Sequence, residues 1–430
     1  MKLVIIGLGY VGLANVAYLV SHGQKSVVAF DCDGAKISSL KANHFPFKEP
    51  ALNDVLKKEY KKIVYTSTVK DIADADAYFL AVGTPNKEDG TADLSFLNAA
   101  VDTIEKVSKG SKIIIRSTVP VGTAKKLKDR LIGFRIISMP EFLAEGRSYE
   151  DESSPYRIVL GAEAPADFEF IRNLRKTDVN EGVPFYYMSN ESAELTKYAS
   201  NIFLSIKISY VNEMARLAEA VGADINDVAL AMGADPRIGH AMLKAGLGYG
   251  GSCFPKDGMA LLETASEEKV TMLLPEAAAA INTSQPLYFF KKIEKRFPTL
   301  KGVKITLLGL AYKAGTSDLR NALSLVLAKL LLAEGAILSA YDPAEGARKA
   351  FAEAYPSVHI FANKDEALKG ADALVIVTEE GEFAQLNETT LLKEMNGRVI
   401  FDGRNLYSPR CFRYFEYISI GRRPTKPDVQ

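Results

Sequence analysis

This 430-residue sequence lacks paired cysteines, tryptophan, an excess of charge and any long apolar run. Its three cysteines lie far apart and its four histidines show no metal-ligand spacing, so we expect neither a disulfide framework nor a metal site. Basic and acidic residues balance at 53 each, which argues against nucleic-acid partners. No segment reaches the roughly 20 apolar residues of a membrane helix. We therefore expect a cytoplasmic protein without a membrane partner, and the glycines of GLGYVGL argue against a signal peptide.

Short apolar segments alternate with helical patterns in the first part of the chain. KLVIIG, SVVAFD, AYFLAV, KIIIRST and FRIISMP each have the length and composition of a buried strand, and a helix is predicted over 11–21. Strands that are apolar on both faces and separated by helices are typical of a parallel, doubly wound sheet.

The part of the chain from Val303 onward repeats this pattern. VKITLLGLAYKAG matches MKLVIIGLGYVGL, AILSAYD matches SVVAFD, GADALVIVT matches DADAYFLAV, and GRVIFDGRN matches SKIIIRSTV. Four matches in one order predict two Rossmann-like, doubly wound domains. Apolar residues at spacings of three to four over 191–221 predict a joining helix of about 30 residues that also offers a homodimer surface. We expect domains at 1–190, 191–295 and 296–430.

Gly7, Gly9 and Gly12 form a GxGxxG pattern between the first strand and the first helix. Such glycines allow a tight turn and bring a pyrophosphate against the helix N-terminus. Asp31 ends the second strand, where a carboxylate binds ribose hydroxyls and repels a 2′-phosphate. The sequence therefore predicts NAD rather than NADP, and the alternative is an ordinary glycine-rich turn.

The second copy keeps Gly309 of this pattern but carries alanine at 311 and 314. Lys313, Arg320 and Arg404 lie near the ends of its strands instead. These cations indicate a second phosphate-bearing ligand that is held by side chains. For any one of the three residues, solvated surface charge is the alternative.

Four polar residues are candidates for the chemistry. Glu141 and Glu145 follow the strand FRIISMP, where a partly desolvated carboxylate can act as a base. The alternative is a solvated pair on a first helical turn. Lys197 and Asn201 are four residues apart on the long helix, so they share one face and can stabilise an oxyanion. An exposed polar face is the alternative for this pair.

Cys253 lies in the glycine-rich segment GLGYGGSCFPKD. Pro255 suits the first turn of a helix, and both a helix N-terminus and the neighbouring Lys256 favour a thiolate. We interpret Cys253 as a nucleophile, and Cys32 and Cys411 as buried structural cysteines. A hydride acceptor combined with a thiolate suggests oxidation at the aldehyde level, through a thioester that is then hydrolysed.

These segments together resemble the UDP-glucose/GDP-mannose dehydrogenase family, and within it the enzymes acting on UDP-glucose. The resemblance covers nearly the whole chain and is carried by GLGYVGL, GTP, STVPVGT, PEFLAEG, KYASNIFL, RIG, GYGGSCFPKD, GLAYKAGTSDLR and FDGRN. It implies that UDP-glucose is oxidised to UDP-glucuronate in two NAD-dependent steps. The implied catalytic residues are Cys253 (nucleophile), Asp257 (its assistant), Lys197 and Asn201 (oxyanion), Glu141 (base) and Thr118 (water).

The resemblance also implies the binding residues. Those for NAD are Gly7, Gly9, Tyr10, Val11, Gly12, Asp31, Lys36, Thr84, Pro85, Ser117, Thr118, Glu145, Lys256 and Arg320. Those for the nucleotide sugar are Glu141, Phe142, Leu143, Glu145, Lys197, Asn201, Arg237 (reaching across a dimer), Tyr249, Gly250, Cys253, Tyr312, Lys313 and Arg404. Three alternatives stay open: a dehydrogenase for GDP-mannose or a UDP-N-acetylhexosamine, a single-step 3-hydroxyacid dehydrogenase, and a silent NAD sensor.

Overall fold

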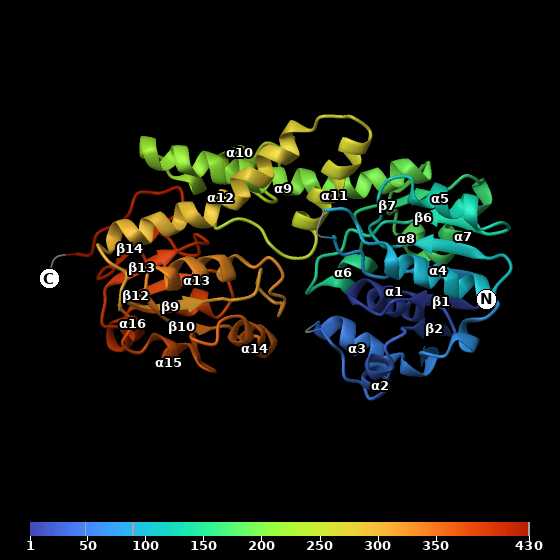
Figure 1. Ribbon diagram of the computed structural model, residues 1–430, viewed down its shortest axis with the longest axis horizontal. Coiled ribbons are helices and arrows are strands. Elements are labelled where there is room, and N and C mark those ends of the chain that lie inside the picture. The colour runs from blue at the N-terminus through green and yellow to red at the C-terminus, as the bar shows by residue number, and fades with distance from the viewer. Residues whose placement is uncertain (48, 88–89, 429–430) are drawn as a thin grey trace. The chain divides into compact units, whose positions relative to one another are not determined.

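The computed structural model describes residues 1–47, 49–87 and 90–428. The chain forms two compact units: Met1–Ser200 with Met259–Val270, and Asn201–Gly258 with Thr271–Gln430. Figure 1 shows a sheet in each unit, blue to green in the first and orange to red in the second. None of the helices within the described residues has the length and apolar character needed to span a bilayer. The three predicted domain limits stay a prediction.

The sheet of the first unit has eight strands in the order β3-β2-β1-β4-β5-β6-β7-β8. The strands are β1 Leu3–Ile6, β2 Val27–Phe30, β3 Ile63–Thr66, β4 Ala77–Leu80, β5 Lys112–Ile115, β6 Arg135–Ser138, β7 Ile158–Gly161 and β8 Phe185–Met188. The first six have the strand order of a dinucleotide-binding fold, with parallel neighbours. β7 is antiparallel to β6, with Ser138 opposite Gly161, so the connection 139–157 begins and ends at the same edge of the sheet.

Helices cover both faces of this sheet. They are α1 Tyr10–Ser21, α2 Gly34–Lys41, α3 Pro50–Lys58, α4 Ser95–Val107, α5 Thr123–Arg130, α6 Ser148–Ser153, α7 Pro165–Leu174 and α8 Lys176–Asn180. Along β1, Leu3 and Ile5 enter one apolar cluster, whereas Val4 and Ile6 enter another. Because alternate residues of a strand point to opposite faces, this confirms a sheet buried on both sides.

The sheet of the second unit repeats the same order, as β11-β10-β9-β12-β13-β14, and all its pairs are parallel. Its strands are β9 Lys304–Leu308, β10 Ile337–Tyr341, β11 His359–Ile360, β12 Ala373–Ile376, β13 Val399–Asp402 and β14 Glu416–Ser419. Its helices are α13 Leu323–Ala333, α14 Glu345–Ala354, α15 Lys364–Leu368 and α16 Glu388–Glu394. The four sequence matches fall on β1/β9, β2/β10, β4/β12 and β5/β13, so the predicted repeat is confirmed.

Four helices lie between the two copies in the sequence: α9 Asn190–Val221, α10 Ile225–Gly233, α11 Phe254–Glu267 and α12 Leu273–Arg296. The 32 residues of α9 confirm the predicted joining helix, and they contribute to both units. Gly222 follows with a φ of 79°, a left-handed conformation that ends a helix at low cost for glycine.

Candidate active site

The loop between β1 and α1 needs glycine for two different reasons. A Cβ on Gly7 would lie 2.7 Å from the carbonyl oxygen of Ala81, and one on Gly12 would lie 1.9 Å from that of Gly7. These two glycines therefore allow backbone to pack on backbone. Around Gly9, the N-cap of α1, such a Cβ would have no atom within 4 Å from the described residues beyond its own chain neighbours and helix backbone. The open space at this helix N-terminus fits the pyrophosphate of NAD.

Asp31 follows β2 and is held by three hydrogen bonds. Its Oδ2 accepts from the amide of Leu8 at 2.9 Å and from Lys36 Nζ at 2.7 Å, and its Oδ1 accepts from the amide of Asp33 at 3.0 Å. Burial alone would raise the pKa of this carboxyl, but these hydrogen bonds outweigh burial and lower the pKa below its usual value. Asp31 is thus kept charged at the strand end where a 2′-phosphate would lie.

Two further loops at the carboxyl ends of the strands are joined to each other. Thr84 Oγ1, after β4, donates to the carbonyl of Thr118 at 2.7 Å, and Ser117 Oγ, after β5, donates to the carbonyl of Val82 at 2.7 Å. Because β1, β4 and β5 are neighbours, the structure brings Thr84, Pro85, Ser117 and Thr118 to the same edge as the glycine loop.

Glu141 lies in an irregular loop after β6, and not on a helical turn. Its side chain is about 5% exposed; Oε1 accepts from Lys197 Nζ at 2.9 Å and Oε2 from the amide of Leu143 at 2.5 Å. Lys197 is equally buried, with Nζ 5.5 Å from the centre of the Phe142 ring. Glu145 is partly buried in the same loop. The alternative of a solvated helical pair is therefore wrong.

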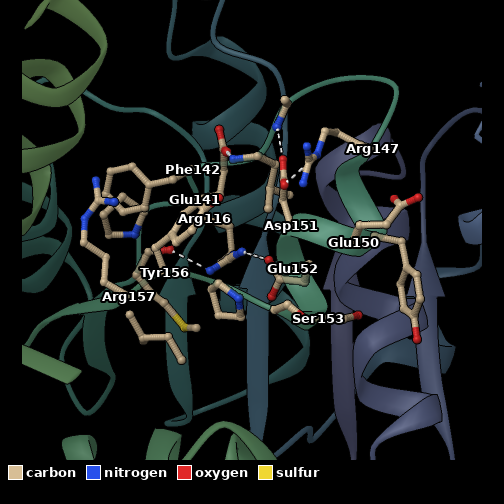
Figure 2. A pocket seen from close by; sticks show the side chains of 18 of the residues that line it. Arg116, Glu141, Phe142, Arg147, Glu150, Asp151, Glu152, Ser153, Tyr156 and Arg157 are labelled. Carbon is tan, nitrogen blue, oxygen red and sulfur yellow. Dashed lines mark hydrogen bonds and ion pairs between the residues drawn. The ribbon is translucent and has the colours of Figure 1, made fainter. Parts of the chain in front are cut away.

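A cavity of about 660 Å³ lies beside this loop (Figure 2). Arg116 crosses its centre: Nη2 pairs with Glu152 at 2.6 Å, and Nη1 donates to the carbonyl of Met139 at 3.2 Å. Glu152 also pairs with Arg175. All three charged side chains are nearly fully buried, so this network fixes the strand end that leads to Glu141.

Arg157 lines the same cavity and was not predicted from the sequence. The antiparallel pair Ser138–Gly161 places residue 157 opposite residue 142 if its register is continued. Indeed, the Arg157 side chain lies beside the Phe142 ring (Figure 2). Its guanidinium is 3.9 Å from the centre of that ring, and its Nη2 donates to Ser200 Oγ at 3.2 Å. Burial lowers its pKa. A cation thus lies next to the predicted sugar-binding segment 141–143.

A second group of site residues surrounds Asp257 in the other unit. Asp257 is 1% exposed; its Oδ2 accepts from Asn201 Nδ2 at 2.6 Å and its Oδ1 from Lys256 Nζ at 2.5 Å. Cys253 immediately precedes α11, and its carbonyl accepts from the amide of Asp257 at 2.8 Å. Cys253 is partly exposed, whereas Cys32 and Cys411 are exposed, so the prediction that these two are buried is wrong. A reachable thiol at a helix N-terminus, next to a buried acid, is an arrangement suited to nucleophilic catalysis.

The glycine-rich segment before Cys253 is held in place by hydrogen bonds. Asn282 pairs with the backbone of Tyr249 in both directions, at 2.8 and 2.9 Å, and the amide of Gly251 donates to the carbonyl of Arg320. A Cβ on Gly250 would lie 2.2 Å from the carbonyl oxygen of Asn321. The glycines therefore let this segment pack against the loop 312–322.

That loop marks the main difference between the two copies. α1 begins three residues after Gly7, whereas α13 begins at Leu323, fourteen residues after Gly309. Asp342, at the position of Asp31, is fully buried and accepts from the amides of Leu310 and Ala311. The second copy therefore lacks the helix-terminus site of the first, and its acid is more deeply buried than Asp31.

The predicted phosphate-binding cations of the second copy differ in their exposure and in their hydrogen-bond partners. Arg404 Nε donates to the carbonyl of Val377 at 2.7 Å and Nη1 to that of Gly248 at 3.2 Å. Arg320 is largely exposed and pairs with Asp318, and Lys313 and Tyr312 are partly buried. Arg237 lies elsewhere in the sequence, is highly exposed and pairs with Asp235. Within the described residues, no cluster of His, Cys, Asp or Glu suits a metal ion.

Three family models match the chain in sequence. They describe the NAD binding domain (residues 1–177), the central domain (191–284) and the UDP binding domain (306–409) of the UDP-glucose/GDP-mannose dehydrogenase family. The chain belongs to this family, and it is an NAD-dependent oxidoreductase.

Individual relatives agree with the family models. The chain is 37% identical to the UDP-glucose 6-dehydrogenase of Pseudomonas aeruginosa, over 98% of both chains, and 37% identical to that of Rhizobium meliloti, over 98% of this chain and 100% of the relative. Among solved structures it is similar to a UDP-glucose dehydrogenase from Pyrobaculum islandicum (32% identity, TM-score 0.88, 97% and 96% covered). A UDP-D-ManNAc dehydrogenase from Pyrococcus horikoshii is also similar (28% identity, TM-score 0.87, 98% and 99% covered).

Proposed function

We propose that this protein oxidises UDP-glucose to UDP-glucuronate in two NAD-dependent steps, through a thioester on Cys253. The observation that carries the proposal is the partly exposed Cys253 at the start of α11, one turn before Asp257. The carboxylate of Asp257 in turn binds Asn201 and Lys256. A single-step hydroxyacid dehydrogenase needs no such thiol and no second nucleotide-binding domain. A silent NAD sensor needs none of these groups.

Each residue has a task in this scheme. The primary alcohol first loses a hydride and a proton, giving an aldehyde. Cys253 Sγ then adds to the aldehyde carbon, and Lys197 and Asn201 stabilise the oxyanion. Loss of a second hydride leaves a thioester, which water cleaves with Glu141 as base and Thr118 as its positioning residue. In total, one alcohol, two NAD⁺ and one water give one carboxylate, two NADH and three protons. Bound NAD supplies the hydride acceptor.

The nucleotide is proposed to bind the second copy through the side chains of Lys313 and Arg404. Arg320 is assigned to the cofactor. The site is proposed to be completed in a homodimer, with Arg237 reaching the substrate of the opposite subunit. The exposed apolar residues Phe203, Tyr210 and Leu217 support this dimer, because their spacing of seven residues forms one stripe along α9.

The test is to trap the thioester. Glu141→Gln keeps the side chain's size but removes its proton-accepting capacity, so thioester hydrolysis should slow by about 10²–10⁴-fold. Intact-protein mass spectrometry after mixing with UDP-glucose and NAD should then show a UDP-glucuronyl adduct. The adduct should be absent from the Glu141→Gln, Cys253→Ala double variant. A Cys253→Ala enzyme that makes UDP-glucuronate at a near-normal rate would contradict the proposal.

A second candidate function is the oxidation of a UDP-N-acetylhexosamine. The similarity to the UDP-D-ManNAc dehydrogenase of Pyrococcus horikoshii is the observation that favours it. Comparing kcat/KM for UDP-glucose, UDP-N-acetylmannosamine and GDP-mannose separates the candidates. A yield of two NADH per UDP-glucose is expected from the preferred function, and one NADH per substrate would contradict it.

A further inference from the structure

Glu194 is a buried acid to which the proposed chemistry assigns no task. It lies on α9, three residues before Lys197, and is 4% exposed. Its Oε2 accepts from the amide of Gly122 at 2.6 Å and its Oε1 from the amide of Ala124 at 2.8 Å. Both amides belong to the N-terminus of α5, so Glu194 attaches α9 to the segment that follows Thr118.

A small cavity lies beside this acid. Its volume is about 10 Å³, close to the least that holds one water molecule. Ser117, Thr118, Ser138, Glu194 and Lys197 all line it. Ser138 Oγ is buried and, within the described part of the chain, has no hydrogen-bond partner from the protein. A buried hydroxyl that faces a polar cavity of this size is a suitable partner for an ordered water.

The surroundings of Glu194 bring the pKa of its carboxyl close to neutral pH. Burial raises its pKa to about 7, although the two α5 amides act in the opposite direction, and Glu191 on the same helix raises it further. Lys197 also lines the cavity and is paired with Glu141. The nearest basic residues of α5, at 125–126, are exposed. The acid can therefore gain or lose a proton near pH 7.

We propose that this cavity binds one water molecule and that Glu194 accepts, through this water and Lys197, the proton released when the alcohol is oxidised. Because Glu194 acts through Lys197, it is a positioning residue. The inference rests on the proposed function. As the hydride leaves the substrate carbon, the Lys197 ammonium gives one proton to the water, and the amine that results takes the hydroxyl proton of the substrate. The water passes a proton to the Glu194 carboxylate. The alcohol, NAD⁺ and carboxylate thus give aldehyde, NADH and carboxylic acid. Glu194 then releases the proton to solvent before the next turnover.

The test is the pH dependence of kcat/KM for NADH formation from UDP-glucose, measured from about pH 5.5 to 9. The wild-type value should fall below about pH 7, because a protonated Glu194 accepts no proton. Glu194→Gln should lose this acidic limb and about 10²-fold in rate. Glu194→Asp should retain the limb. Glu213→Gln, an exposed residue farther along α9, is the matched control and should leave the profile unchanged. A Glu194→Gln enzyme that keeps both the limb and the rate would overturn the inference.

Ser138→Ala provides a second test that keeps both hydrogen bonds of Glu194. Removing a hydroxyl without a protein partner should leave the thermal midpoint unchanged or raise it, yet the rate should fall several-fold if the hydroxyl holds the water. An unchanged rate would count against the water site. Wild-type enzyme that forms no NADH from UDP-glucose would instead contradict the proposed function, so the two failures are distinguishable.

Discussion

Replacing Lys197 by methionine should destabilise the protein strongly, because it leaves the buried carboxylate of Glu141 without its cation. Methionine has nearly the same volume, so the change removes charge rather than packing. Breaking a buried ion pair from one side costs about 3–5 kcal/mol. For a unit of this size, roughly 2–4 °C of thermal midpoint are lost per kcal/mol, so the midpoint should fall by about 6–20 °C.

Calorimetry without ligands tests this prediction, and two further variants make it specific. Glu141→Gln in the Lys197→Met background should recover much of the loss, because a neutral amide needs no cation. Lys349→Met removes the same kind of side chain from the exposed pair with Glu345 and should change the midpoint little. Equal shifts for Lys197→Met and Lys349→Met would refute the reasoning, as would a double variant that loses the sum of the two single losses.

Three other predictions concern ligands and pH. The charged Asp31 should give NAD a much higher kcat/KM than NADP, and similar values would contradict its assignment. Lys313→Ala should raise KM for the nucleotide sugar while NAD affinity, measured by titration calorimetry, stays nearly unchanged; equal losses would indicate a different role. Because the pKa of Glu194 is about 7 when folded and 4.5 in its ordinary state, the folded protein binds this proton more tightly. Its stabilising contribution, complete below about pH 4.5, should be lost as the pH rises to about 7. In urea unfolding, the free energy of unfolding should decline less over this pH range for Glu194→Gln than for the wild type. An equal decline would contradict the raised pKa of Glu194.

In the first unit, the sequence predicted five central strands, which are continuous apolar runs, and missed β3, β7 and β8. β1, β2, β4, β5 and β6 lie in the centre of the sheet and are buried on both faces, so their composition alone identifies them. β3 and β8 are the outermost strands of the sheet, and β8 is only partly buried, which weakens the apolar pattern. β7 was missed although it is fully buried and has the same length of four residues as β1.

Part of the candidate site depends on contacts that a sequence pattern does not contain. The GxGxxG loop with Asp31 and the Cys253 segment are local, so residue type and spacing predict them. Arg157 reaches the edge of the sheet only because β7 runs antiparallel to β6, and the sequence predicted a parallel sheet. Glu194 contacts residues about seventy positions away. Its one local signal is its place three residues before Lys197, on the same helix face.

The two copies of the fold have diverged by using the same loop differently. In the first copy, α1 starts directly after the loop, and Gly9 leaves open space at its N-terminus for a phosphate. In the second copy, the loop 312–322 intervenes before α13 and binds the glycine-rich segment, through the amide of Gly251 and the side chain of Asn321. The loop that carries Lys313 and Arg320 therefore also fixes the backbone leading to Cys253. If Lys313 binds the nucleotide as proposed, nucleotide binding and the placement of the thiol depend on one structural element. A substitution within 312–322 should then alter substrate affinity and turnover together.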